Sequence, residues 1–72
     1  MAAQTVRSDV AGKVWRVVAK PGDRVAADDT LVILESMKME IPVVTPSAGT
    51  VTSILVREGD EVAEDQEIAV VG

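Results

Sequence analysis

The chain contains no cysteine and no histidine among its 72 residues. The lack of cysteine excludes disulfides and thiolate chemistry. The lack of histidine removes the commonest general base and metal ligand, and with it every Ser-His-Asp or Cys-His arrangement. The acids and amines that remain form no recognisable catalytic constellation, so the sequence argues against an enzyme.

Positive charge and long apolar runs are also scarce. Seven lysines and arginines stand against twelve aspartates and glutamates, which gives a net charge of −5 and a pI near 4.4. Such a chain is a poor partner for nucleic acid or for an anionic membrane. No apolar run is long enough to span a bilayer, and the first residues lack the apolar stretch of a signal peptide. We therefore expect a cytoplasmic protein with no nucleic-acid or membrane partner.

Aromatic residues are nearly absent, since Trp15 is the only one. Its indole is expected to fill the core or to form a half-buried cover, and a docking role is the less favoured interpretation. Acidic residues gather at Asp28-Asp29 and between Glu58 and Glu67, but their spacing does not match an EF-hand loop. We predict no metal site.

An internal duplication is the main feature that the chain does contain. Residues 6–35 and residues 43–72 share nine identical positions at an offset of 37. The pairs are Val6/Val43, Ala11/Ala48, Gly12/Gly49, Val14/Val51, Gly22/Gly59, Asp23/Asp60, Val25/Val62, Ala26/Ala63 and Asp28/Asp65. Chance similarity in a valine-rich chain does not easily explain Ala-Gly and Gly-Asp steps that recur at one offset. We infer a single domain, residues 1–72, built from two matched halves.

Both halves are typical of β-structure. Their apolar segments are rich in β-branched residues and show no helical periodicity. The expected strands include residues 13–19, 30–34, 41–45 and 50–56. The alternation slips near Trp15-Arg16 and at the matching Ser53, which predicts either a bulge in each half or a strand with apolar neighbours on both faces. The fold class is therefore all-β, a flattened antiparallel β-barrel or sandwich of about eight short strands in two pseudo-twofold-related halves.

Glycines mark the turns and the places where strands begin. The Gly-Asp steps at residues 22–23 and 59–60 predict tight turns, because glycine adopts positive φ and aspartate bonds its own backbone. Gly12 and Gly49 predict a close approach of two backbones. Under pseudo-twofold symmetry, the joint between the halves has its counterpart just past Gly72. The two termini should therefore lie together, at the end of the molecule opposite the joint.

The joint between the halves is the segment Glu35-Ser36-Met37-Lys38-Met39-Glu40. Its length predicts a tight hairpin with Met37 and Lys38 at the tip, and a primed turn made of these residues would carry positive-φ strain. An ordinary surface lysine in a polar loop is the plain alternative. It explains less well why methionine, a flexible side chain suited to docking, flanks the lysine on both sides. In a second alternative, Met39 packs back onto the sheet.

This segment resembles the attachment signature of biotinyl domains, which is usually Ala/Ser-Met-Lys-Met. Residues 46–51, Pro-Ser-Ala-Gly-Thr-Val, are similar to the family's Pro-x-x-Gly-Thr-Val step, and residues 56–62 are similar to its Val-x-x-Gly-Asp-x-Val turn. The resemblance covers essentially the whole chain. It departs at residues 9–12, where the family often has Pro-x-Pro-Gly. Residues 19–23 leave no room for the inserted thumb of one class of bacterial acetyl-CoA carboxylase carriers.

The resemblance implies a barrel-sandwich hybrid and a carrier that is not itself an enzyme. A biotin protein ligase would join biotin to the side-chain amine of Lys38. The flanking recognition residues would be Glu35, Ser36, Met37, Met39 and Glu40. The modified domain would then carry a carboxyl group between a biotin carboxylase and a carboxyltransferase, with the cofactor supplying the chemistry. We expect a monomer in isolation.

Two other functions stay open. A lipoyl carrier, or an acceptor of both biotin and lipoate, would use the same fold and the same lysine. Lipoyl domains typically show Asp-Lys-Ala/Val, however, whereas this chain has methionine on each side of Lys38. An unmodified β-barrel adaptor would use the surface only for protein contacts. Met1 and the complete repeats at both ends favour a free-standing small protein.

Overall fold

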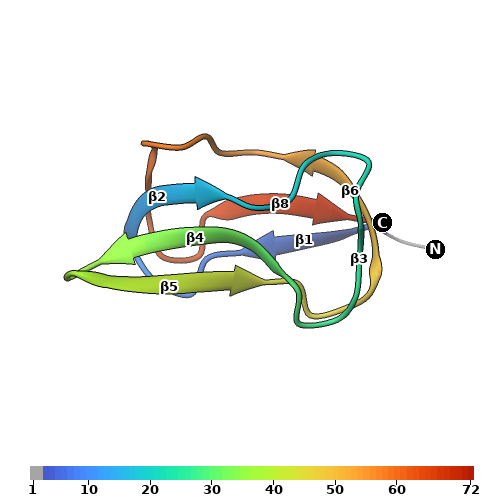
Figure 1. Cartoon of the computed structure of the whole chain (residues 1–72), viewed down its shortest axis with the longest axis horizontal. Helices are drawn as coiled ribbons and strands as arrows, with labels where there is room; N and C mark the ends of the chain where they lie inside the picture. Colours follow the sequence, from blue (N-terminus) through green and yellow to red (C-terminus); the bar gives the residue numbers. More distant parts are fainter. Residues whose placement is uncertain (1–2) are drawn as a thin grey trace.

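The computed structural model of the chain describes residues 3–72, and within that range it contains eight strands and no helix. The strands form two four-stranded antiparallel sheets (Figure 1). Their bounds are β1 Gln4–Arg7, β2 Gly12–Val17, β3 Arg24–Val25, β4 Thr30–Ser36, β5 Met39–Val44, β6 Gly49–Ile54, β7 Glu61–Val62 and β8 Glu67–Val71. The all-β class and the eight short strands confirm the prediction. The described residues include no helix able to cross a membrane.

Each sheet combines strands from both halves of the chain. One sheet has the order β1-β8-β6-β3 and the other has the order β5-β4-β2-β7. The strand registers repeat with the sequence, since Val14 pairs with Leu34 and Val51 pairs with Val71, 37 residues later in each case. The sequence duplication is therefore a structural duplication in which the two halves interlock.

The core is aliphatic and lies between the inner faces of the two sheets. Leu31, Leu34 and Ile68 are fully buried, and most of the other core members are valines. Burial of each large aliphatic side chain contributes roughly 1.5–3 kcal/mol, so these residues supply much of the stability of so short a chain. Buried and exposed residues alternate at Val6 of β1 and Val43 of β5, as the period of a half-buried sheet requires, whereas β4 and β8 each bury two consecutive residues, Leu31–Val32 and Ile68–Ala69.

Both predicted bulges are present. The register shifts between Val14 and Arg16, and at the matching place between Val51 and Ser53. Trp15 is the extra residue of the first bulge, and its side chain is 47% exposed. The interpretation of Trp15 as a core filler was therefore wrong, because Val14 takes the inward position and the indole becomes a half-buried cover outside the sheet.

Two strands end sooner than their β-branched runs predict. β2 ends at residue 17 and β6 ends at residue 54, instead of residues 19 and 56. The backbone N–H groups of Val18 and Ala19 both donate to the carbonyl of Leu31, and this shared acceptor breaks the regular ladder. A favourable composition thus extends beyond the point at which strand pairing stops.

The predicted Gly-Asp turns share one pattern in the two halves. Gly22 and Gly59 adopt φ values of 97° and 94°. The carboxylates of Asp23 and Asp60 each accept a backbone N–H from the residue three positions upstream, at 3.1 and 2.9 Å. Positive φ and the carboxylate bond together close each turn, as the sequence indicated.

Two further matched pairs connect the halves, and neither was predicted. Asp28 and Asp65 adopt positive φ, at 71° and 70°. Ser8 and Thr45 are buried, and each hydroxyl donates to a backbone carbonyl two residues along the chain. The N–H of Asp28 donates to the carbonyl of Thr45, and the N–H of Asp65 donates to the carbonyl of Ser8, both at 2.7 Å. Each half thereby fixes a turn of the other half.

The molecule is elongated, with extents of 36 × 19 × 18 Å. The β4–β5 hairpin forms one end, whereas β1 begins and β8 ends at the other (Figure 1). This arrangement confirms the predicted separation of the joint from the termini. The predicted close approaches are present too, because a Cβ built on Gly12 would lie 2.8 Å from the carbonyl oxygen of Glu35, and one on Gly49 would lie 2.8 Å from that of Gly72.

Candidate functional site

Lys38 lies at the tip of the β4–β5 hairpin, at the far end of the molecule from the termini. Strand pairing continues to Ser36 and Met39, so that only Met37 and Lys38 remain in the turn. Their φ values are 52° and 66°, which is the signature of a type I′ turn. The predicted tight hairpin and its positive-φ strain are thus both present.

The side chains at the tip project into solvent. Met37 is 92% exposed and Met39 is 63% exposed. The alternative in which Met39 packs back onto the sheet was therefore wrong, because Met39 begins β5 next to the turn, four residues before Val43, the buried residue of that strand. Lys38 is exposed, and none of the hydrogen bonds or ion pairs formed among residues 3–72 involves its amine. The tip presents one free amine between two flexible apolar side chains.

The remaining predicted site residues lie on the two strands that support the turn. Glu35 and Glu40 pair with each other and are exposed, whereas Ser36 is half-buried opposite Met39. Nothing in the sequence indicated that β2 and β7 lie beside the hairpin. The sheet brings Lys13 and Glu61 into line with Glu35, because Lys13 pairs with both residues.

The hairpin is held firmly at its base. Leu34 is fully buried, and β4 pairs with β5 on one side and with β2 on the other. The close approach of Gly12 to the carbonyl of Glu35 packs β2 tightly against the end of β4 that leads into the turn. A two-residue turn with positive-φ strain persists only where the surrounding structure holds it. The pairing of β4 with β5 and β2 supplies that support.

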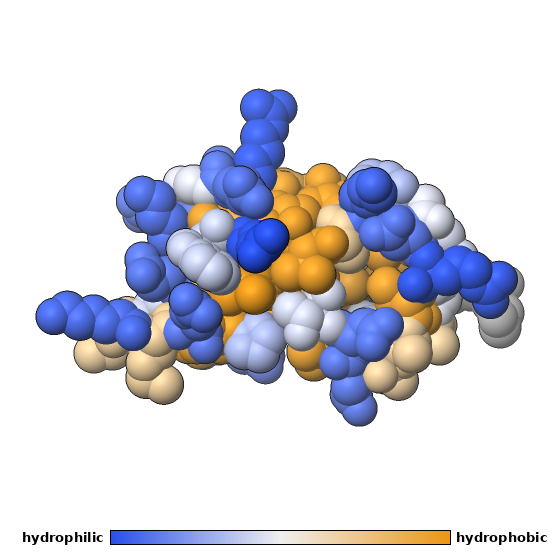
Figure 2. Space-filling view, viewed as in Figure 1, coloured by the Kyte–Doolittle hydropathy of each residue, from blue (hydrophilic) through white to orange (hydrophobic). Residues whose placement is uncertain are grey.

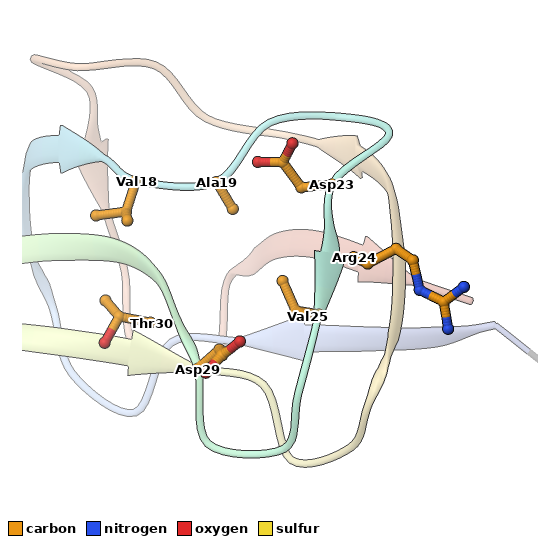
Figure 3. Close-up of a pocket in the computed structure, with 7 residues that line it drawn as sticks. All are labelled: Val18, Ala19, Asp23, Arg24, Val25, Asp29 and Thr30. Carbon is orange, nitrogen blue, oxygen red and sulfur yellow. The ribbon is translucent and has the colours of Figure 1, made fainter.

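A surface depression lies away from the hairpin. It is an open hollow of about 410 Å³ beside β3, lined by Val18, Ala19, Asp23, Arg24, Val25, Asp29 and Thr30 (Figure 3). The apolar centre of this face and its hydrophilic rim are visible in Figure 2. The carboxylates of Asp23 and Asp29 accept backbone N–H groups of their own turns, and Arg24 points away from the depression. Its polar groups therefore do not converge on a ligand.

No cluster of three or more potential metal ligands occurs among residues 3–72. Among the exposed lysines, Lys38 is distinguished by its place at a hairpin tip between two exposed methionines. Its amine can form a covalent bond when a partner supplies an activated acid, and it needs no pocket of its own.

A family model described as "Biotin-requiring enzyme", for domains that carry biotin or lipoate, matches residues 1–71. Among curated proteins, the chain is 44% identical over 69 residues to the biotinylated protein TB7.3 homolog of Mycobacterium leprae (strain TN), and the match covers 96% of this chain and 97% of that protein. It is 45% identical over 60 residues to the biotin/lipoyl attachment protein of Bacillus subtilis (strain 168), with 83% and 82% covered.

A lipoyl protein is similar as well. The chain is 44% identical over 57 residues to the dihydrolipoyllysine-residue acetyltransferase component of the pyruvate dehydrogenase complex of Pseudomonas aeruginosa, and the match covers 79% of this chain and 10% of that protein. Sequence similarity therefore extends to carriers of both cofactors.

Two solved structures share the fold. The chain matches the Kluyveromyces lactis urea carboxylase with a TM-score of 0.95 and 36% identity, covering 100% of this chain and 6% of that one. It matches a single-chain, multi-domain long-chain acyl-CoA carboxylase with a TM-score of 0.86 and 31% identity, covering 94% and 7%. In each case the fold of this chain occurs as a small part of a large carboxylase.

Proposed function

This chain belongs to the biotin/lipoyl attachment family, and from that membership we propose that it is a biotin carrier modified on Lys38. The observation that carries the proposal is the free amine of Lys38, held at a strained hairpin tip between exposed Met37 and Met39. In this proposal the protein is not an enzyme but a carrier module of a biotin-dependent carboxylase system, and it works as a cytoplasmic monomer.

The fit of biotin rests on the chemistry of the tip. An amide-linked cofactor needs an accessible amine that is free of competing partners, and Lys38 satisfies both conditions among the described residues. In the attachment step, the Lys38 nitrogen forms a bond to the activated carboxyl carbon of biotin, adenylate leaves, and the amine proton passes to a base of the ligase or to solvent. Bound biotin supplies carboxyl-group chemistry through its ureido ring.

The protein's own contribution is presentation. The hairpin places Lys38 at the end of a 36 Å body, away from the sheets and the termini. Such a position lets the modified side chain enter a partner's active site without a clash with the rest of the domain. Tethering then replaces free diffusion with a high local concentration of the cofactor at each site.

The partners in this proposal are a biotin protein ligase, a biotin carboxylase and a carboxyltransferase. The similarity to parts of urea carboxylase and acyl-CoA carboxylase structures supports carboxylase partners. Attachment comes first, because only the modified lysine can carry a carboxyl group between the two carboxylase sites.

Lipoate is the second candidate cargo. The name of the Bacillus subtilis relative includes both cofactors, and the Pseudomonas aeruginosa relative is a lipoyl protein. The methionines on both sides of Lys38 favour biotin, since lipoyl domains typically have aspartate before the lysine. A chain that accepts either biotin or lipoate would be consistent with both groups of relatives.

Co-expression with a biotin protein ligase tests the proposal. We expect one biotinyl group per chain by intact mass, a signal with streptavidin, and the loss of both in Lys38→Arg, which keeps the charge but removes the acceptor amine. A parallel incubation with lipoyl ligase and lipoate measures the alternative. An unmodified wild-type chain, or a biotin adduct that survives Lys38→Arg, would sink the proposal, and an unmodified chain would favour the adaptor.

A further inference from the structure

The only aromatic side chain of the protein lies on the outer face of the sheet that bears the hairpin. Trp15 is the extra residue of the β2 bulge and is 47% exposed, whereas its neighbour Val14 points into the core. Aromatic side chains contribute most to stability where they are buried. Nearly half of this residue stays in contact with water, so core packing does not account for a tryptophan here.

The duplication shows that the bulge itself does not require an aromatic residue. The equivalent position in the other half is Thr52, the extra residue of the β6 bulge, and it is exposed as well. The two bulges interrupt the same strand pairing at matched places, with an indole in one and a hydroxyl in the other. Trp15 is therefore specific to the sheet that carries Lys38.

Two further side chains extend the exposed indole into an apolar surface. Ile33 pairs with Pro42 on one side and with Arg16, the neighbour of Trp15, on the other. Paired residues of antiparallel strands project from the same face. Ile33 lies between two buried residues of β4, which places this face outside the core, and Pro42 is exposed. We call Trp15, Ile33 and Pro42 the apolar platform.

The apolar platform lies within reach of a group attached to Lys38. In register, Trp15 falls between the levels of Leu34 and Ile33, which lie on the third and fourth residue pairs from the turn. With strands about 4.8 Å apart and a rise of about 3.3 Å per residue, the Cα atoms of Trp15 and Lys38 are about 15 Å apart. An amide-linked biotin places its ring system about ten bonds from the Lys38 Cα atom, or about 12 Å when extended. The widths of the ring and of the indole cover the remaining distance.

The other half of the chain indicates the direction in which the indole leans. The Cγ2 atom of Thr52 lies 3.4 Å from a Cβ built on Gly72. Gly72 is the equivalent of Glu35, so the same contact predicts that Trp15 leans toward Glu35. Because Glu35 stands near the end of β4 that leads into the turn, the indole leans toward Lys38.

We propose that the apolar platform is a resting site for the biotinyl group carried by Lys38 of the same chain. This inference rests on the proposed function and adds a place where the cofactor lies between visits to its partners. The ring system of biotin has an apolar, sulfur-containing side that suits an indole face, and a polar ureido edge that suits water. A platform that is open to solvent can cover the first and leave the second hydrated.

The tether makes so shallow a site effective. A group held by one side chain experiences a local concentration of about millimolar at a surface that the side chain can reach. The apolar platform covers the ring on one side only, so binding is weak and the ring exchanges freely with solvent. A partner's active site, which encloses the ring, can therefore capture it without a large loss of binding free energy.

The fluorescence of Trp15 reports on this site alone, because the protein contains no other aromatic residue. The experiment compares the unmodified chain with the chain biotinylated on Lys38. We expect biotinylation to shift the emission maximum to shorter wavelength and to lower the acrylamide quenching constant about 1.5- to twofold, since the ring covers one face of the indole. Proton NMR should also show nuclear Overhauser effects between the indole and the biotin ring.

The duplication supplies a matched control in the double variant Trp15→Thr/Thr52→Trp. Each substitution introduces the residue that the other half already has, and together they move the single indole beside Gly72, at the end of the molecule opposite Lys38. Biotinylation should leave the emission and the quenching of this variant unchanged. Lys38→Gln removes the charge of the amine without adding a ring, and its Trp15 signals should match those of the unmodified wild type. Circular dichroism checks that each variant keeps the fold.

Effects confined to the biotinylated wild type support the resting site. A biotinylated wild type with unchanged quenching and no Overhauser effect to the indole overturns it. An equal change in the double variant, or in Lys38→Gln, overturns it as well, because the signal would then come from modification in general or from the lost charge. A wild-type chain that takes no biotin would instead contradict the proposed function, so the two failures are distinguishable.

Discussion

Met37 and Lys38 adopt a backbone conformation that favours glycine, and neither is glycine. Their φ values of 52° and 66° lie in the left-handed region, where a Cβ atom meets the following carbonyl at a cost of about 1–2 kcal/mol per residue. Asn-Gly is the usual solution for such a turn. A substitution by glycine would relieve this strain. The presence of Met37 and Lys38 at the tip therefore indicates that their side chains serve something other than stability.

Replacement of Lys38 by glycine should therefore stabilise the protein while it removes the acceptor amine. We expect Lys38→Gly to raise the free energy of unfolding by about 0.5–1 kcal/mol, after allowance for the greater freedom of glycine in the unfolded chain. Urea titration measures the change. Lys38→Ala is the control, because it removes the amine but keeps the Cβ atom. Equal stability of the two variants would mean that the turn carries no such strain.

Sequence alone located the strained residues at the tip, because the length of the joint between two strands left room for only a tight turn. It did not predict positive φ for Asp28 and Asp65, although the pair is identical in the two halves. Aspartate is common in ordinary turns, so its presence gave no sign of a left-handed backbone. Ser8 and Thr45 were missed because they differ in identity, and only the structure shows that both are buried.

The element that matters most is the β4–β5 hairpin with β2 behind it. Gly12 lets β2 approach β4 so closely that any side chain would meet the carbonyl oxygen of Glu35. This contact involves backbone, which cannot turn aside as a flexible side chain can. The support of the Lys38 turn thus depends on a glycine that lies 26 residues earlier in the chain.

Gly12→Ala should destabilise the fold by about 1–3 kcal/mol, the usual range for overpacking. The added Cβ would lie 2.8 Å from the Glu35 oxygen, and β2 would have to move away from β4. Thermal unfolding gives the measurement, with Lys13→Ala on the neighbouring exposed position as the control. The control should change stability by no more than about 0.5 kcal/mol. A loss no larger than that of the control would show that β2 yields easily.

At this scale the sequence predicted the bulges and the close approach at Gly12, since both left a mark that recurs in each half. It placed the ends of β2 and β6 two residues too late. The runs that continue to residues 19 and 56 are as favourable for strands as those before them. The end of a strand depends on its partner strand, as the two N–H groups that share the carbonyl of Leu31 show. The composition of one strand alone does not contain that information.

The whole molecule is a pair of interlocked halves. Both four-stranded sheets need strands from each half, because β4 pairs with β5, β1 with β8, β2 with β7 and β3 with β6. Half of the chain alone would expose Leu31 and Leu34, or Ile68, and would leave the edges of its strands unpaired. Cooperativity should therefore extend over the entire chain.

Residues 1–36 and residues 37–72, prepared as separate peptides, should each be unfolded. We expect narrow amide dispersion in the proton–nitrogen NMR spectrum of either peptide, because neither can complete a sheet or enclose a core. The intact chain under the same conditions is the reference and should give a dispersed β-sheet spectrum. A dispersed spectrum from one peptide alone would indicate that a half is an independent folding unit.

The sequence predicted the overall arrangement well because the duplication restricts it. The repeat placed Lys38 and the termini at opposite ends before any register was known. The alignment of Lys13 and Glu61 with Glu35 was not predicted, since it depends on which residues pair across β4, β2 and β7. Glu61 is 23 positions from Lys38, and nothing in the local sequence associates the two.

The intact mass of the protein from its native source tests the central claim most directly, since it separates biotin, lipoate and no cofactor in one measurement. The account predicts a chain heavier by one biotinyl group, with fragment ions that place the group on Lys38. A lipoyl group on Lys38 would contradict the choice of cargo. An unmodified chain, or biotin on any other lysine, would contradict the claim that this hairpin tip is the site of attachment.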